Sequence, residues 1–132
     1  MDLVENAEIL TKTFGQWPSF HDAEIVSLLL SREHENPVLL EVKIHVFETT
    51  SAIDSSGAYV SRNHTLVTLR FSGVREDASI QWFNHQNVMA ALHIYASESG
   101  EPTLRIEMPS LYGADVSFTC DTAEVISATP YG

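Results

Sequence analysis

The sequence predicts an α+β domain in which an N-terminal helix packs on a curled, mainly antiparallel sheet of six to eight strands. Three observations support this fold class. Apolar residues near the N-terminus have helical spacing, later segments alternate apolar and polar residues, and turn-forming residues lie between those segments. An open curled sheet and a partly closed barrel produce the same pattern, so the sequence favours neither of them.

The helix is predicted over residues 2–14. Apolar side chains recur along one face of it, at Leu3, Ala7, Leu10 and Phe14. Acidic residues lie near its amino end and Lys12 lies near its carboxyl end, as the helix dipole favours. Gly15 suits the position after the last turn, and Pro18 disfavours helical backbone at Trp17. The helix should therefore end before Trp17.

The strands are predicted from alternation with a period of two. Five segments have one apolar and one mostly polar face, which is typical of antiparallel strands with one solvated side: 41–48, 66–72, 88–97, 103–108 and 115–121. Residues 80–83 form a further short strand. Residues 24–32 have apolar side chains on both parities, so we interpret them as a strand that is buried on both faces.

Turn chemistry connects these strands. The sequence Asp-Ser-Ser-Gly at 54–57 predicts that residues 41–71 form one long hairpin. Residues 99–102 form another turn, 84–87 divide two strands, and Tyr112-Gly113 breaks the last pair. The chain contains no repeat or linker, so residues 1–132 are expected to form a single domain.

The composition is that of a globular protein, with 44% hydrophobic and 19% charged residues. The apolar runs are too short to cross a membrane. The opening sequence MDLVENAEIL has no basic region typical of a secretory signal. The single cysteine suits a reducing compartment. We therefore expect a cytoplasmic protein.

The charge restricts the class of partner. Eighteen acidic residues against seven basic ones give a net charge of −11. Such a surface repels nucleic acid and anionic membranes, and it attracts a partner with a basic surface. The alternative interpretation is that the charge serves only solubility.

The segment WPSFHDAE, residues 17–24, carries the densest group of functional side chains. His21, Asp22 and Glu24 could line a catalytic or ligand-binding pocket. However, adjacent residues of an extended chain point to opposite sides. We favour an elbow, in which Trp17 and Phe20 supply buried surface and the polar groups bond to the backbone.

Other candidate residues are scattered. His45 and His93 lie on the polar parity of their predicted strands and could share a sheet face. Cys120 lies on an apolar parity and is predicted to be a buried structural thiol. The amides Asn84, Gln86 and Asn87 suit a turn, or a polar contact patch beside Trp82 and Phe83.

The sequence contains no recognised metal-ligand spacing, nucleophile elbow or glycine-rich phosphate loop. We therefore predict no metal, no cofactor and no enzymatic activity.

Three stretches resemble the Immunity protein 50 family of bacterial polymorphic-toxin systems: WPSFHDAE at 17–24, FNHQNV at 83–88 and SFTCDTAEVISATP at 117–130. The resemblance implies a small cytoplasmic protein that is encoded beside a toxin and neutralises it. It implies no catalytic residues. If the toxin is a nuclease, its cleft must be basic, and an acidic surface could occupy that cleft in place of phosphates.

Three functions thus remain open. The first is a protein that blocks a toxin. The second is a small-ligand or enzyme-like curled sheet with a pocket at His21, Asp22 and Glu24. The third is a non-catalytic adaptor that exposes a sheet edge, for which a homodimer is an alternative arrangement. The candidate partner-binding or motif residues are Trp17, His21, Asp22, Glu24, Asn84, Gln86 and Asn87.

Overall fold

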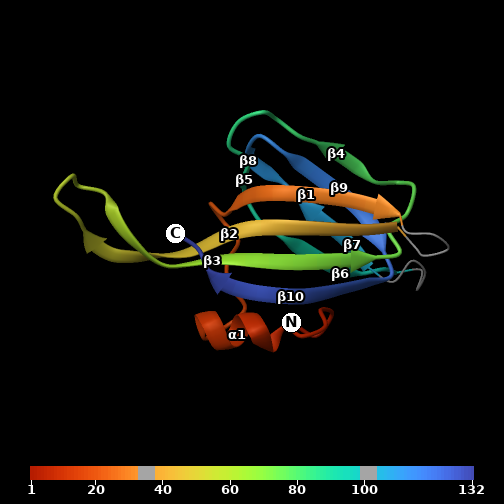
Figure 1. Cartoon of the computed structure of the whole chain (residues 1–132), viewed down its shortest axis with the longest axis horizontal. Helices are drawn as coiled ribbons and strands as arrows, with labels where there is room; N and C mark the ends of the chain where they lie inside the picture. The colour runs from red at the N-terminus through yellow and green to blue at the C-terminus, as the bar shows by residue number, and fades with distance from the viewer. Residues whose placement is uncertain (33–37, 99–103) are drawn as a thin grey trace.

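A computed structural model describes residues 1–32, 38–98 and 104–132 of the chain (Figure 1). Within these ranges the chain forms one helix and ten strands. In order along the chain they are α1 (Glu8–Phe14), β1 (Glu24–Arg32), β2 (Val38–Ile53), β3 (Tyr59–Ser72), β4 (Ser79–Gln81), β5 (Val88–Met89), β6 (His93–Ala96), β7 (Leu104–Met108), β8 (Ser110–Tyr112), β9 (Asp115–Cys120) and β10 (Thr122–Pro130).

The strands form two sheets. One sheet has the order β10-β3-β2-β1-β5-β8 and the other has the order β4-β9-β7-β6. Every pair of named strands that the structure describes is antiparallel, and the smaller sheet lies behind the larger one in Figure 1. The α+β class with a mainly antiparallel sheet is confirmed. The sheets do not close into a barrel, and the described strands exceed the expected six to eight because they form two layers.

The core lies between the two sheets. Alternate residues of β2, β7 and β9 point inward and are buried, as in a sandwich with two solvated outer faces. Phe71 on β3 and Phe118 on β9 meet edge to face across this core, with their ring centroids 5.1 Å apart.

The helix is shorter than predicted, because it begins at Glu8 and not at residue 2. Asn6 has a left-handed backbone (φ 59°), which is incompatible with a helix through this point. Glu5 instead pairs with the edge of β10, through hydrogen bonds of 2.9 Å to Ala123 and Val125. Figure 1 shows α1 lying along this same edge.

The predicted end of the helix is confirmed. Gly15 adopts a left-handed conformation (φ 81°) and donates its N–H to the Thr11 carbonyl at 2.8 Å.

Strand β1 has the predicted bounds, but it is not buried on both faces. Leu29, for example, is 59% exposed. It lies opposite Glu41 of β2, on the outer face of the six-stranded sheet. The second sheet covers only the inner face, so apolar residues of the outer parity remain in solvent.

The predicted strand at 88–97 is wrong, because the structure divides it between β5 in the larger sheet and β6 in the smaller one. The chain crosses between the sheets at residues 90–92, where the Ala90 N–H bonds to the Pro109 carbonyl. His93 therefore lies in a different sheet from His45, and the prediction of a shared face is wrong as well.

The other predicted strands differ mainly at their ends. Those at 80–83, 103–108 and 115–121 correspond to β4, β7 and β9. Strands β8 and β10 were not predicted. The predicted turn at 99–102 lies outside the described residues.

The long hairpin predicted at 41–71 is confirmed as β2 and β3. Its distal part extends well beyond the sandwich (Figure 1). The structure describes every residue from 47 to 64, and none of them is buried. We call residues 47–64 the arm. Its tip turns at Asp54, whose carboxylate accepts hydrogen bonds from the Ser56 N–H, the Ser56 hydroxyl and the Ala58 N–H.

Candidate functional site at the base of the arm

The segment 17–24 forms an elbow between α1 and β1. Trp17 and the buried Phe20 pack with their ring centroids 5.8 Å apart. Asp22 has a left-handed backbone (φ 69°), and its N–H bonds to the Met89 carbonyl at 3.0 Å. Ala23 also exchanges a hydrogen bond with β5, accepting from the Met89 N–H at 2.8 Å. The elbow thus fixes the start of β1 against β5.

The three ionisable residues of the elbow do not converge on one point. His21 Nδ1 lies 3.3 Å from Asp22 Oδ2, and both side chains are more than half exposed. Glu24 is already part of β1, where it lies opposite His45 of β2. The structure therefore places Glu24 beside His45 and leaves His21 and Asp22 as a separate pair.

A hollow of about 380 Å³ separates the elbow from the base of the arm. Its walls are Phe14, Gln16, Pro18, Ser19, His21 and Asp22 on one side, and Phe47, Glu48 and Thr49 of β2 on the other. We call it the elbow hollow. His21 and Asp22 therefore line a concavity, as predicted for a pocket, but Glu24 does not.

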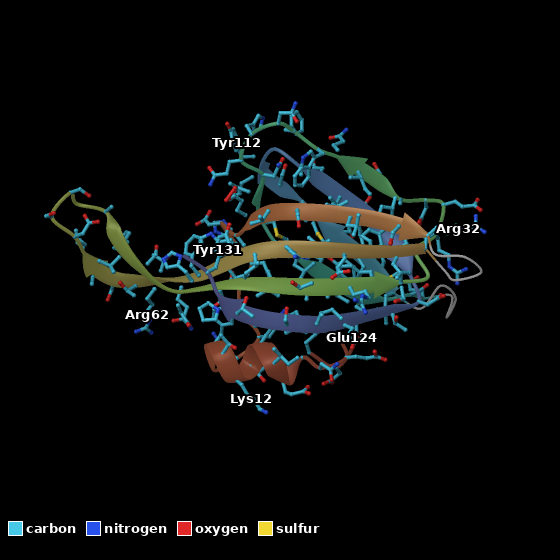
Figure 2. The ribbon with its side chains drawn as sticks, in the orientation of Figure 1. Lys12, Arg32, Arg62, Tyr112, Glu124 and Tyr131 are labelled. Atoms are coloured by element: carbon cyan, nitrogen blue, oxygen red, sulfur yellow. The ribbon has the colours of Figure 1, made fainter. Side chains whose placement is uncertain are left out.

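Four rings gather where the arm leaves the sandwich. His45 Nε2 lies 2.8 Å from His64 Nδ1, so one imidazole donates a hydrogen bond to the other. The His45 ring also packs on Tyr131 and Phe47, with centroid distances of 4.8 and 5.5 Å. We call these four residues the base cluster. Figure 2 places Tyr131 at this junction, where its N–H bonds to the His64 carbonyl at 3.0 Å.

The base cluster favours a neutral His45. Burial and the nearby His64 lower the pKa of His45, while the Glu24 carboxylate partly opposes this effect. His45 therefore acts as a hydrogen-bonding aromatic side chain and not as a cation at neutral pH.

The base cluster was not predicted as a site. Its members come from β2, β3 and the C-terminal segment, and their contacts depend on strand register. One signal was present: a hairpin centred on the predicted turn at 54–57 brings His45 close to His64.

The predicted amide cluster divides into exposed and buried parts. Asn84 and Gln86 are exposed, whereas Asn87 is buried. The Asn87 amide donates to the carbonyls of Phe83 and His85 at 3.2 and 2.9 Å. Its Oδ1 finds no hydrogen-bond donor among the residues that the structure describes. Asn87 thus acts as a clamp within the loop.

This clamp requires glycine at position 113. Gly113 has φ 91°, and a Cβ there would lie 2.6 Å from Asn87 Oδ1. The loop also presents exposed rings. Among them, His85 packs on Phe83 and Tyr112 with centroid distances of 5.2 and 4.8 Å.

The elbow, the base cluster and this loop share one region of the larger sheet. Cross-strand partners run from His45 to Glu24, then to Val88 and on to Tyr112. Residues paired in this way point to the same side of a sheet. The candidate residues near 17–24 and 83–88, far apart in sequence, therefore become neighbours.

Cys120 is buried, as predicted. Burial raises the pKa of its thiol to about 12, and Sγ lies 3.6 Å from the Thr122 carbonyl. The thiol therefore remains protonated and unreactive at neutral pH.

Over residues 1–32, 38–98 and 104–132, no three His, Cys, Asp or Glu side chains come together as metal ligands would. The described helix is also far too short to cross a membrane.

Comparison with known families identifies the class of protein. The family described as Immunity protein 50 matches residues 6–131, which is nearly the whole chain. The chain belongs to the Immunity protein 50 family. Searches of curated proteins and of solved structures gave no significant match. Membership of this family assigns the chain the role of an immunity protein, and it implies that the chain binds a cognate toxin.

Proposed function

We propose that this Immunity protein 50 chain acts in the bacterial cytoplasm, where it binds a polymorphic toxin encoded beside it and covers the toxin's functional site. The family match over residues 6–131 carries this proposal. The mechanism needs surface complementarity and no catalysis. The separation of Glu24 from His21 and Asp22 agrees with such a role.

The charge suggests which toxins fit. A net charge of −11 favours a toxin with a basic surface. A nuclease has such a surface in its phosphate-binding cleft. We infer that the immunity protein places carboxylates where the nucleic acid would bind. Long-range attraction would then accelerate association, as it does for oppositely charged protein pairs.

The test is co-expression with the toxin domain encoded by the adjacent reading frame. Cells that express the toxin domain alone should die, and cells that also express this chain should survive. Purified proteins should form a stable complex in size-exclusion chromatography. Continued toxicity together with no complex would exclude the proposal.

Salt dependence tests the electrostatic part separately. The association rate should fall steeply between about 10 mM and 500 mM salt, because screening shortens the range of charge attraction. An association rate that does not change with salt would exclude electrostatic steering. The proposal that the chain binds the toxin would still stand.

The elbow hollow supports a second candidate, a small-ligand site lined by His21 and Asp22. Glu24, the third residue of the predicted pocket, does not line this hollow. A ligand screen by thermal unfolding tests this candidate. A ligand whose stabilising effect is lost in Asp22→Asn would favour it over toxin blocking.

A further inference from the structure

Among the residues that the structure describes, the arm pairs mainly with itself, and its base also contacts α1, where the Asn63 amide donates to the Thr13 carbonyl at 3.1 Å. It is a two-stranded hairpin held by cross-strand pairs such as Glu48 with Arg62 and Thr49 with Ser61. Isolated hairpins of this kind are marginally stable in water. Near its tip it also exposes Ile53, Tyr59 and Val60, of which Tyr59 is 64% exposed. Exposed apolar and aromatic side chains on a protruding element are typical of a binding surface.

The elbow hollow gives this surface a concave base. Asp22 of the elbow and Glu48 of β2 both line it. Glu48 is paired with Arg62 at 2.9 Å, whereas Asp22 Oδ2 lies 3.3 Å from His21 Nδ1. Lys12 belongs to α1 and points away from the sandwich in Figure 2.

The charge of this region points to the chemistry of its occupant. Residues 13–24 and 47–64 contain four carboxylates, of which Asp22 and Glu48 line the hollow, and Arg62 is the only lysine or arginine of these two ranges. The hollow therefore suits a positively charged segment. A second copy of this chain is a poor occupant, because each copy carries a net charge of −11.

We propose that the arm and the elbow hollow are the surface that binds the toxin. A basic, protruding loop of the toxin enters the hollow between Asp22 and Glu48, and apolar toxin surface packs on Tyr59 and Val60. This inference rests on the proposed function, because it assigns the surface through which that function is exerted.

Removal of the arm tip is the strongest test. Asn-Gly in place of residues 50–60 would join Thr49 to Ser61, which are opposite each other in the hairpin, by a two-residue turn. This variant should keep the thermal unfolding midpoint of the parent. Its affinity for the purified toxin domain should fall about 30-fold or more, the loss expected when an interface hot spot is removed.

Two point variants test the elbow hollow and the arm tip separately. Asp22→Asn removes the charge while keeping a residue type that tolerates the left-handed backbone. It should weaken toxin binding about tenfold, with a smaller salt dependence. Tyr59→Ser should weaken binding by a similar factor.

Each point variant has a matched control. Glu76→Gln removes one carboxylate beyond the other end of β3, and Tyr95→Ser removes an exposed tyrosine from β6 of the smaller sheet. Both control variants should bind the toxin as the parent does.

The outcomes separate this inference from the proposed function. If the parent does not bind the toxin, both are wrong. If the parent binds, and the arm deletion, Asp22→Asn and Tyr59→Ser all bind equally well, only the surface assignment is wrong. Should the deletion fail to fold, the two point variants decide. If the arm deletion instead converts a dimer to a monomer and toxin binding persists, the occupant is a second copy and the inference is overturned.

Discussion

The two halves of the β2–β3 hairpin are both built from cross-strand pairs but differ in burial. In the sandwich half, Leu40, Val42, Ile44 and Val67 are completely buried. In the arm, residues 47–64, no side chain is buried. Cross-strand pairing continues through both halves. Backbone pairing therefore defines the shape of the hairpin, while burial determines which half stabilises the protein.

The boundary between the halves is marked by structure. The register shifts between Val46 and Glu48, and the base cluster surrounds this irregularity. A β-bulge bends a strand and increases its twist. The arm can thus leave the plane of the sandwich, and the pairing resumes at Glu48 and Arg62.

The largest expected effect is in the sandwich half. Phe71→Ala on β3 should lower the free energy of unfolding by about 3–5 kcal/mol, because it leaves a cavity beside Phe118. Urea unfolding followed by fluorescence or circular dichroism would measure this loss. A loss below about 1 kcal/mol would mean that the buried half does not dominate stability.

A smaller effect should come from the boundary. The pKa of His45 is lowered in the folded state, so the unfolded chain binds more protons than the folded chain below pH 6.5. The contribution of His45 to the free energy of unfolding should be fully present above pH 6.5. It should be lost as the pH falls through the lower folded pKa. His45→Gln should flatten this part of the stability profile.

A local effect is expected at the arm tip. Asp54→Ala removes the acceptor for Ser56 and Ala58, so amide hydrogen exchange should accelerate near the turn while the global unfolding midpoint stays constant. These bonds lower the pKa of Asp54 below 3.8. The turn should therefore stay ordered above pH 3.8 and loosen as the pH falls through the lower folded pKa. Faster exchange in the core would contradict this separation.

The smallest effect on stability is expected from Tyr59→Ser. The side chain is exposed, so the free energy of unfolding should change by no more than about 0.5 kcal/mol. The same urea titration used for Phe71→Ala gives the comparison within one strand. A loss comparable to that of Phe71→Ala would show that the arm packs on the protein itself.

Local signals in the sequence predicted those parts of the fold that local chemistry determines. Gly15 ends the helix, residues 24–32 form β1, and the Asp54 turn creates the long hairpin, all as expected. Alternation also placed most strands. It could not show that residues 88–97 change sheets, because the same period of two fits either sheet.

The candidate site was less predictable for the same reason. His21 and Asp22 were identified, but Glu24 turned away because it had already entered β1. His64 and Tyr131 contact His45 only through pairing between distant segments. The sequence did not distinguish the arm from the sandwich half, since Ile53 and Val60 resemble ordinary strand residues. Only the structure shows that the second sheet does not cover them.

The pairing of Glu5 with Ala123 and Val125 has a consequence for how the protein is made. During translation, Glu5 leaves the ribosome long before β10 is synthesised. The N-terminal segment must therefore wait for β10 before this pairing, which joins residues far apart in the sequence, can form. Such non-local closure slows folding. We expect nascent chains that lack β10 to depend on chaperones until the final strand arrives.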